Sequence, residues 1–84
     1  MNILHLTLMK KWFDQILTGI KRVEYREIKP YWTTRLLDKN GKPKQYDIIE
    51  FRNGYSKDAR KMKVEFEGLK IGKKNYEILL GKII

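Results

Sequence analysis

The segment KMKVEFEGL, residues 61–69, alternates strictly between apolar and charged side chains. Its apolar positions, Met62, Val64 and Phe66, fall on one side of an extended chain, and the charged positions fall on the other. An alternation of period two predicts a strand that buries one face and exposes the other. The chain must therefore form a sheet with one covered face, and the rest of the sequence has to supply the partner strands and the core.

Other segments alternate or are rich in β-forming residues. We predict further strands at residues 2–8, 22–28, 46–51 and 75–84. In the first of these, three leucines share one face, while His5 and Thr7 share the other. Gly81 interrupts the last one and predicts a β-bulge.

A short helix is predicted between the first two strands, over residues 10–18. Its aromatic and aliphatic residues have the i, i+4 spacing of a helix: Trp12 with Ile16, and Phe13 with Leu17. Gly19 stands where a left-handed C-cap residue is expected. We expect both aromatic side chains to lie in the core.

Residues 31–37 predict one further helical turn, which packs Trp32 and either Leu36 or Leu37 on the core. Trp32 is equally suited to contact a ligand. Exposed turns are predicted at residues 38–45, at Asn53-Gly54 and at Gly72.

Together these elements predict an α+β fold: a small, mostly antiparallel β-barrel with one or two short peripheral helices. At 84 residues the chain is expected to be a single domain, residues 1–84. It contains no cysteine, so it has neither disulfides nor a cysteine-ligated zinc site, which suits a reducing cytoplasm. We expect no metal and no other cofactor.

No apolar run approaches the roughly 18 residues that a membrane span needs. The first residues also lack the charged region and the cleavage site of a signal peptide. We therefore expect a soluble, cytoplasmic protein with no membrane partner.

Basic residues outnumber acidic ones, with 19 Lys and Arg against 10 Asp and Glu, which gives a net charge of +9. This charge attracts polyanions and makes their binding dependent on salt, so nucleic acid is the leading partner class. The alternative is a lysine-rich surface that serves solubility alone.

The segment GIKRVEYRE, residues 19–27, concentrates charge on a predicted strand. Because strand side chains alternate, Glu24 and Arg26 share one face of the strand. Val23 and Tyr25 share the opposite, apolar face, which is expected to anchor the barrel. Lys21 lies in the turn before the strand and can join the charged face. A carboxylate between two cations is either a structural ion pair or a polar site.

The run WFDQILTGIKRVEYR, from Trp12 to Arg26, resembles the signature of the ASCH domain, a small barrel related to the PUA fold. The core of that signature, G-x-K-x-x-E-x-R, matches at Gly19, Lys21, Glu24 and Arg26. The expected order of strands and helices agrees along most of the chain. The resemblance implies a single ASCH-like domain with an RNA-related role, because family members bind RNA in a cleft that the signature residues line.

Some members of that family hydrolyse nucleoside amides or cleave RNA. In the amidohydrolases the signature lysine acts with a threonine three residues later and with a distant glutamate. This chain keeps the lysine as Lys21 but has Glu24 in place of the threonine, which argues against carrying the amidohydrolase activity over.

The first functional hypothesis is an RNA- or nucleotide-binding domain with a basic cleft. Lys21 and Arg26 would hold phosphates or bases, although Arg26 could equally form only a salt bridge. Tyr55 lies among cations that include Arg52, the pattern of a stacking platform for unpaired bases. The alternative for Tyr55 is that it pins its own loop.

Two residues of the first predicted strand, His5 and Thr7, are candidates for the lining of the same cleft. A lone histidine is more often structural.

A second hypothesis makes the protein a hydrolase of a modified nucleoside or of RNA, with Lys21 and Glu24 as catalytic residues. A third is an interaction domain for an acidic protein partner. The sequence specifies neither the ligand nor the oligomeric state.

Overall fold

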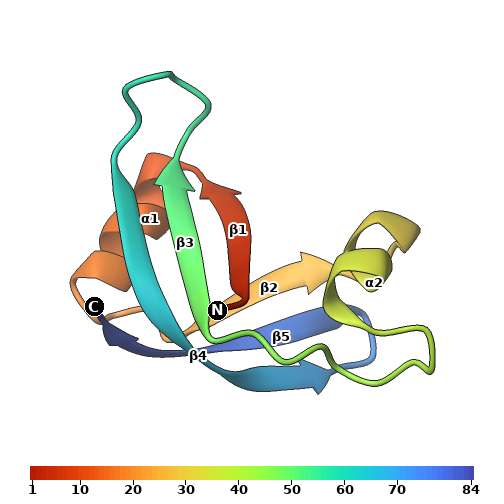
Figure 1. Cartoon of the computed structure of the whole chain (residues 1–84). Coiled ribbons are helices and arrows are strands. Elements are labelled where there is room, and N and C mark those ends of the chain that lie inside the picture. Colours follow the sequence, from red (N-terminus) through yellow and green to blue (C-terminus); the bar gives the residue numbers. More distant parts are fainter.

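The computed structural model describes residues 1–84, and its five strands form one curved sheet that bends into a half-barrel (Figure 1). The strands are β1 (Ile3–Leu8), β2 (Val23–Glu27), β3 (Ile48–Asn53), β4 (Lys61–Ile71) and β5 (Asn75–Ile83). Their order across the sheet is β1-β3-β4-β5-β2, and every neighbouring pair is antiparallel except β1 with β3. The predicted α+β fold with a mostly antiparallel sheet and two short helices is confirmed.

The two edge strands, β1 and β2, are not paired with each other by their backbones. The sheet is therefore open on one side. Because both helices and β2 lie between β1 and β3 in the sequence, the chain returns to pair β3 in parallel with β1.

The third strand begins two residues later than predicted, at Ile48 instead of Tyr46. Tyr46 and Asp47, the two residues before this strand, hold the preceding loop and the N-terminus by hydrogen bonds of their side chains. The hydroxyl of Tyr46 donates to the carbonyl of Arg35 at 2.6 Å, and the carboxylate of Asp47 accepts the backbone N–H of Asn2 at 2.7 Å.

The predicted bulge in the last strand is present. The β4–β5 register shifts between Val64 and Phe66, and Gly81 lies in the extra length of β5. A Cβ atom at Gly81 would come within 3.0 Å of the Cβ of Glu65, so only glycine allows the two strands to approach here.

The core is one cluster of 13 buried hydrophobic residues, to which both helices and every strand except β2 contribute. The only buried residue of β2 is Glu24. The prediction that Val23 and Tyr25 anchor the barrel is therefore wrong: Val23 is half-buried, and Tyr25 is 52% exposed.

Strand register explains this reversal. Directly opposed residues of an antiparallel pair lie on the same face of the sheet. Glu24 is opposite Ile78 and Arg26 is opposite Tyr76, and both partners are core residues of β5. The charged face of β2 is thus its inner face.

Helix α1 (Lys10–Leu17) directs Phe13 and Ile16 into the core, and Gly19 follows it with φ +83°, as predicted. Trp12 and Leu17 are 38% and 40% exposed. The prediction of Trp12 as a core residue is wrong because an eight-residue helix presents one face to the sheet, and Phe13 and Ile16 occupy that face.

Helix α2 (Pro30–Leu36) begins with proline in its first turn and buries Leu36, while Trp32 and Leu37 pack partly against the core. This confirms the predicted second helical segment. Thr33 fastens the helix to the sheet, because its hydroxyl is 2.6 Å from the hydroxyl of the buried Tyr76. Neither helix has the length and apolar composition that crossing a membrane would require.

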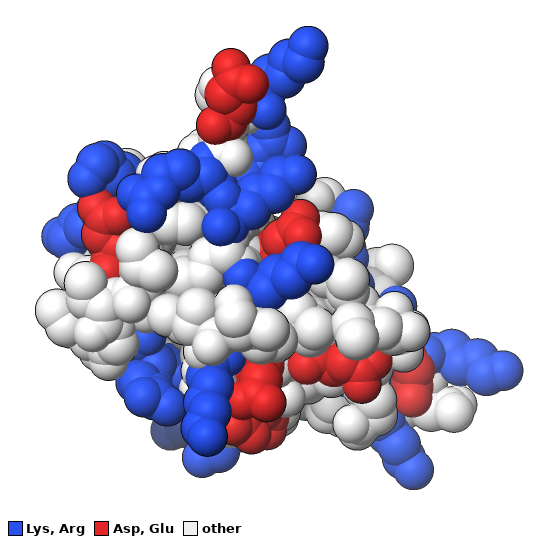
Figure 2. Space-filling model, turned by 60° about the vertical axis from the view of Figure 1, so that its left-hand side comes forward, with Lys and Arg blue, Asp and Glu red and all other residues white.

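Charged side chains are unevenly distributed over the surface. Figure 2 shows Lys and Arg gathered over the upper part of one face, around the β3–β4 loop and α1, with Asp and Glu more frequent below. The densest group of basic side chains on this face thus lies toward its upper end, and further Lys and Arg side chains lie along its lower edge.

The Thr33–Tyr76 hydrogen bond gives a test of how α2 is held. We predict that Tyr76→Phe lowers the free energy of unfolding by about 1 to 2 kcal/mol, because the part-buried Thr33 hydroxyl loses its partner. Thr34→Val, which removes an exposed hydroxyl of the same helix, should change it by less than about 0.5 kcal/mol. Urea unfolding measures both, and equal stabilities of the two variants would contradict the assigned role.

Candidate functional site

The open side of the sheet is bridged by one side chain. Arg26, on β2, donates from Nη2 to the backbone carbonyl of Thr7 on β1 at 3.1 Å. This contact crosses the gap that backbone pairing leaves between the two edge strands. Arg26 therefore has a structural role in addition to any role in binding.

The same guanidinium belongs to a buried charged triad formed by Lys21, Glu24 and Arg26. Arg26 Nη2 lies 2.6 Å from Glu24 Oε2, and Lys21 Nζ lies 3.4 Å from Glu24 Oε1. The carboxylate side chain is only 8% exposed, and both cations are also largely buried. Each cation contacts a different oxygen, which confirms the predicted carboxylate between two cations.

Aromatic rings back both cations of the triad. Lys21 Nζ is 5.0 Å from the ring centre of Trp12 and 5.3 Å from that of Tyr25. The guanidinium carbon of Arg26 is 4.7 Å from the ring centre of Trp32. These distances are within the range of cation–π attraction, so the rings help to hold the charges in place.

A cleft of about 690 Å³ opens over the triad, and its wall also includes Thr7, Trp12, Tyr25 and Trp32. This volume is in the range of pockets that hold small molecules and cofactors. The lining offers three cations, two carboxylates and three large aromatic rings to a ligand, with the pair of Glu27 and Lys29 adding to the triad.

Lys29 lies at the exposed rim of the cleft. Its ammonium is 2.8 Å from a carboxylate oxygen of Glu27, and this hydrogen bond, together with the negative charge, raises the pKa of Lys29. Lys29 thus remains a cation throughout the physiological pH range.

A smaller hollow of about 310 Å³ adjoins the cleft and shares Thr7, Arg26, Lys29 and Trp32 with it. His5 and Tyr55 line this hollow. Tyr55 is 87% exposed, so its ring does not pin its own loop.

The structure therefore brings together six of the seven residues predicted for the site. Four of them, Thr7, Lys21, Glu24 and Arg26, line the cleft, and His5 and Tyr55 line the hollow. His5 also has a neighbour on the adjacent strand, because its Nδ1 is 3.5 Å from Glu50 Oε1.

Arg52 lies outside both spaces. It donates from Nη2 to the backbone carbonyls of Tyr55, at 3.3 Å, and of Ser56. Its guanidinium therefore fastens the loop that carries Tyr55.

Sequence reasoning missed Trp12, Tyr25 and Lys29 as cleft residues and left Trp32 undecided. The composition of the helix could have indicated that Trp12 lies outside the core. Four large apolar residues in an eight-residue helix exceed what one face can bury, so some of them must lie on its flanks.

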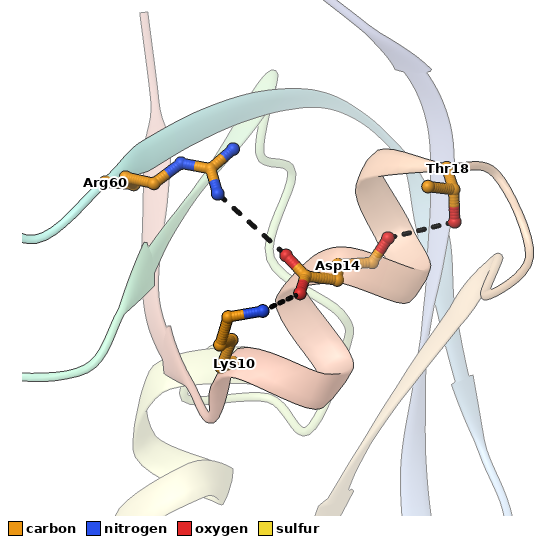
Figure 3. A network of polar contacts seen from close by, with 4 residues as sticks. All are labelled: Lys10, Asp14, Thr18 and Arg60. Atoms are coloured by element: carbon orange, nitrogen blue, oxygen red, sulfur yellow. Dashed lines mark hydrogen bonds and ion pairs between the residues drawn. The ribbon is translucent and has the colours of Figure 1, made fainter.

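A polar network is centred on Asp14 of helix α1 (Figure 3). The carboxylate of Asp14 lies 2.6 Å from Lys10 Nζ and 4.0 Å from Arg60 Nη1, just before β4. At the end of the helix, the hydroxyl of Thr18 donates to the Asp14 carbonyl at 2.9 Å. The contacts of Lys10 and Thr18 lie within the helix, and the Arg60 contact connects the helix to the start of β4.

No protein-family model, curated protein or solved structure matches this chain. The resemblance to the ASCH domain thus stays a prediction from the signature. No group of three or more His, Cys, Asp or Glu side chains is placed to hold a metal ion.

The burial of the triad makes it sensitive to the loss of its carboxylate. We predict that Glu24→Ala lowers the free energy of unfolding by about 3 kcal/mol, because two largely buried cations lose their partner. Glu27→Ala, which breaks an exposed ion pair on the same strand, should cost less than about 1 kcal/mol. Thermal or urea unfolding of both variants measures the difference, and similar losses would mean that burial adds nothing to the triad.

Proposed function

We propose that the protein binds RNA or a nucleotide in the cleft over the Lys21–Glu24–Arg26 triad. The observation that carries the proposal is the combination of two ring-backed cations with three aromatic side chains around one cleft of nucleotide size. The net charge of +9 supplies long-range attraction to a polyanion.

The cations keep donors for a ligand after their internal contacts are made. Arg26 uses Nη2 for Glu24 and for the Thr7 carbonyl, while its Nη1 makes no hydrogen bond in the structure. Lys21 has three N–H donors and contacts one carboxylate oxygen. Both groups can therefore bind phosphate or base oxygens without giving up the triad.

The aromatic residues favour unpaired bases. Exposed tryptophan and tyrosine rings beside cations form stacking surfaces for bases that are not already stacked in a duplex. Trp12, Tyr25 and Trp32 supply such rings to the cleft, and Tyr55 supplies another to the adjoining hollow. An acidic protein partner would use the charge but would have less use for these rings.

The resemblance to the ASCH domain supports the same proposal. Its three polar signature positions, Lys21, Glu24 and Arg26, all line the cleft. In the family these positions are associated with RNA binding, and here they are the charged groups that a ligand would meet.

Salt dependence and a pair of variants test the proposal. We predict that single-stranded RNA binds about tenfold more weakly at 200 mM than at 50 mM salt, because a few phosphate contacts release counterions. Arg26→Ala should weaken binding about tenfold or more, whereas Lys42→Ala, in an exposed loop away from the cleft, should have less than about a threefold effect. Fluorescence anisotropy with labelled RNA measures the affinities.

Circular dichroism checks that the Arg26→Ala variant is folded, and Lys21→Gln serves as a second cleft variant that leaves the Arg26–Thr7 bridge intact. If the cleft variants and Lys42→Ala weaken binding equally, diffuse charge, and not the cleft, binds the RNA.

The contribution of stacking can be measured at Trp12. We predict that Trp12→Ala weakens RNA binding by about tenfold, the effect of losing one stacked base. Leu17→Ala is a matched control, because Leu17 lies on the same helix with nearly the same exposure but outside the cleft. Equal affinities of these two variants would remove Trp12 from the binding surface.

A further inference from the structure

The Glu24 carboxylate faces the cleft with acceptor capacity to spare. Each of its oxygens is contacted by a different cation: Oε1 by Lys21 and Oε2 by Arg26. A carboxylate has about four lone-pair sites on its two oxygens, so one site on each oxygen stays available. The floor of the cleft thus presents two adjacent acceptors with a cation on either side.

A phosphate does not suit this position, because the carboxylate repels a second negative charge. A base edge suits it better. Two adjacent acceptors require two adjacent donors, and an acceptor placed opposite either oxygen would be repelled.

We infer that Glu24 selects guanine as the base bound in the cleft. Guanine has two neighbouring donors on its Watson–Crick edge, N1–H and the 2-amino group, and they can meet the two oxygens of one carboxylate. Adenine and cytosine place an acceptor ring nitrogen next to their amino group, and uracil has one N–H between two carbonyls. The inference rests on the proposed function, because it concerns the same cleft.

One of the two flanking cations, Lys21, extends the match. In guanine the two donors lie between two acceptors, O6 and N3. In the cleft the two carboxylate oxygens lie between Lys21 Nζ and Arg26 Nη2. Lys21 keeps N–H donors for the acceptor of the base beside Oε1, whereas Arg26 Nη2 already gives both of its N–H groups to Glu24 and to the Thr7 carbonyl. Three of the four groups along the base edge therefore find a partner: the two donors on the carboxylate and one acceptor on Lys21.

The ring system of the bound base also has partners. Trp12 and Trp32 back the two flanking cations and line the same cleft. A purine offers them a larger stacking surface than a pyrimidine does.

Removing one functional group from the ligand tests the inference with the unmodified protein. Inosine lacks only the 2-amino group of guanosine. We expect GMP to bind at least about tenfold more tightly than IMP or AMP, the effect of leaving one buried acceptor unpaired. Quenching of tryptophan fluorescence measures the affinities.

The same comparison in RNA shows whether the bound guanine belongs to an RNA chain or to a free nucleotide. Single-stranded heptamers of uridine with one central guanosine, inosine or adenosine are compared with the free nucleotides. Tighter binding of the guanosine heptamer than of GMP assigns the site to RNA, and equal binding assigns it to the free nucleotide. A guanine preference in either arm supports the inference.

Equal affinities for guanosine and inosine ligands overturn the inference while leaving the proposed function in place. Absence of binding to every nucleotide and every RNA overturns both.

The variant Glu24→Gln provides a test by gain of function. Its amide offers one acceptor and one donor, which fits xanthine, since xanthine has a carbonyl in place of the 2-amino group of guanine. We expect the variant to bind XMP more tightly than GMP. Glu77→Gln, at a glutamate of β5 that does not line the cleft, should keep the preference for guanine.

A merely structural role for Glu24 predicts weaker binding of all nucleotides and no shift toward xanthine, which would overturn the inference. If Glu24→Gln does not fold, the comparison of guanosine with inosine in the unmodified protein decides alone.

Discussion

Arg26 spans the one side of the sheet that backbone hydrogen bonds leave open, because its guanidinium donates to the Thr7 carbonyl on β1. Arg26 bonds both to Glu24 on its own strand and to the Thr7 carbonyl on the opposite edge strand, so one guanidinium links the two ends of the half-barrel. Because β2 contributes no hydrophobic residue to the core, this link replaces the apolar contacts that the other strands make. The cleft of about 690 Å³ opens at the same polar gap.

Stability alone does not explain why a small domain keeps a charged triad on the inner face of its sheet. Moving charged groups out of water costs free energy, and the attraction between the charges offsets little more than this cost. Apolar residues of similar volume often stabilise a fold as much as a buried ion pair does. Under the proposed function, the triad has a clearer value in ligand binding. Its side chains are already held by the carboxylate and by Trp12, Tyr25 and Trp32, so little further side-chain entropy is lost when a ligand binds.

Local pattern was enough to predict most of the fold and the contacts within the triad. Alternation gives the strands, and the i, i+3 and i, i+2 spacings of Lys21, Glu24 and Arg26 bring their charges together. Which face of β2 turns inward could not be predicted, because either face alternates equally well and Tyr25 is more apolar than Glu24. That choice depends on the pairing with Ile78 on β5, a contact between segments far apart in sequence. The parallel pairing of β1 with β3 escaped prediction for the same reason.

The net charge of the chain and the buried carboxylate of Glu24 have different effects on a ligand in such a site. The excess of lysine and arginine attracts any polyanion and does not distinguish between sequences. Glu24 opposes that attraction locally, because it is the one carboxylate buried beneath the cleft. Under the proposed function, a nucleotide would bind with its base toward Glu24 and its phosphate away from it, since the reverse orientation places two negative charges together in a buried position. One buried acidic residue in a basic cleft can thus set the orientation of the ligand, which the surrounding positive charge cannot do.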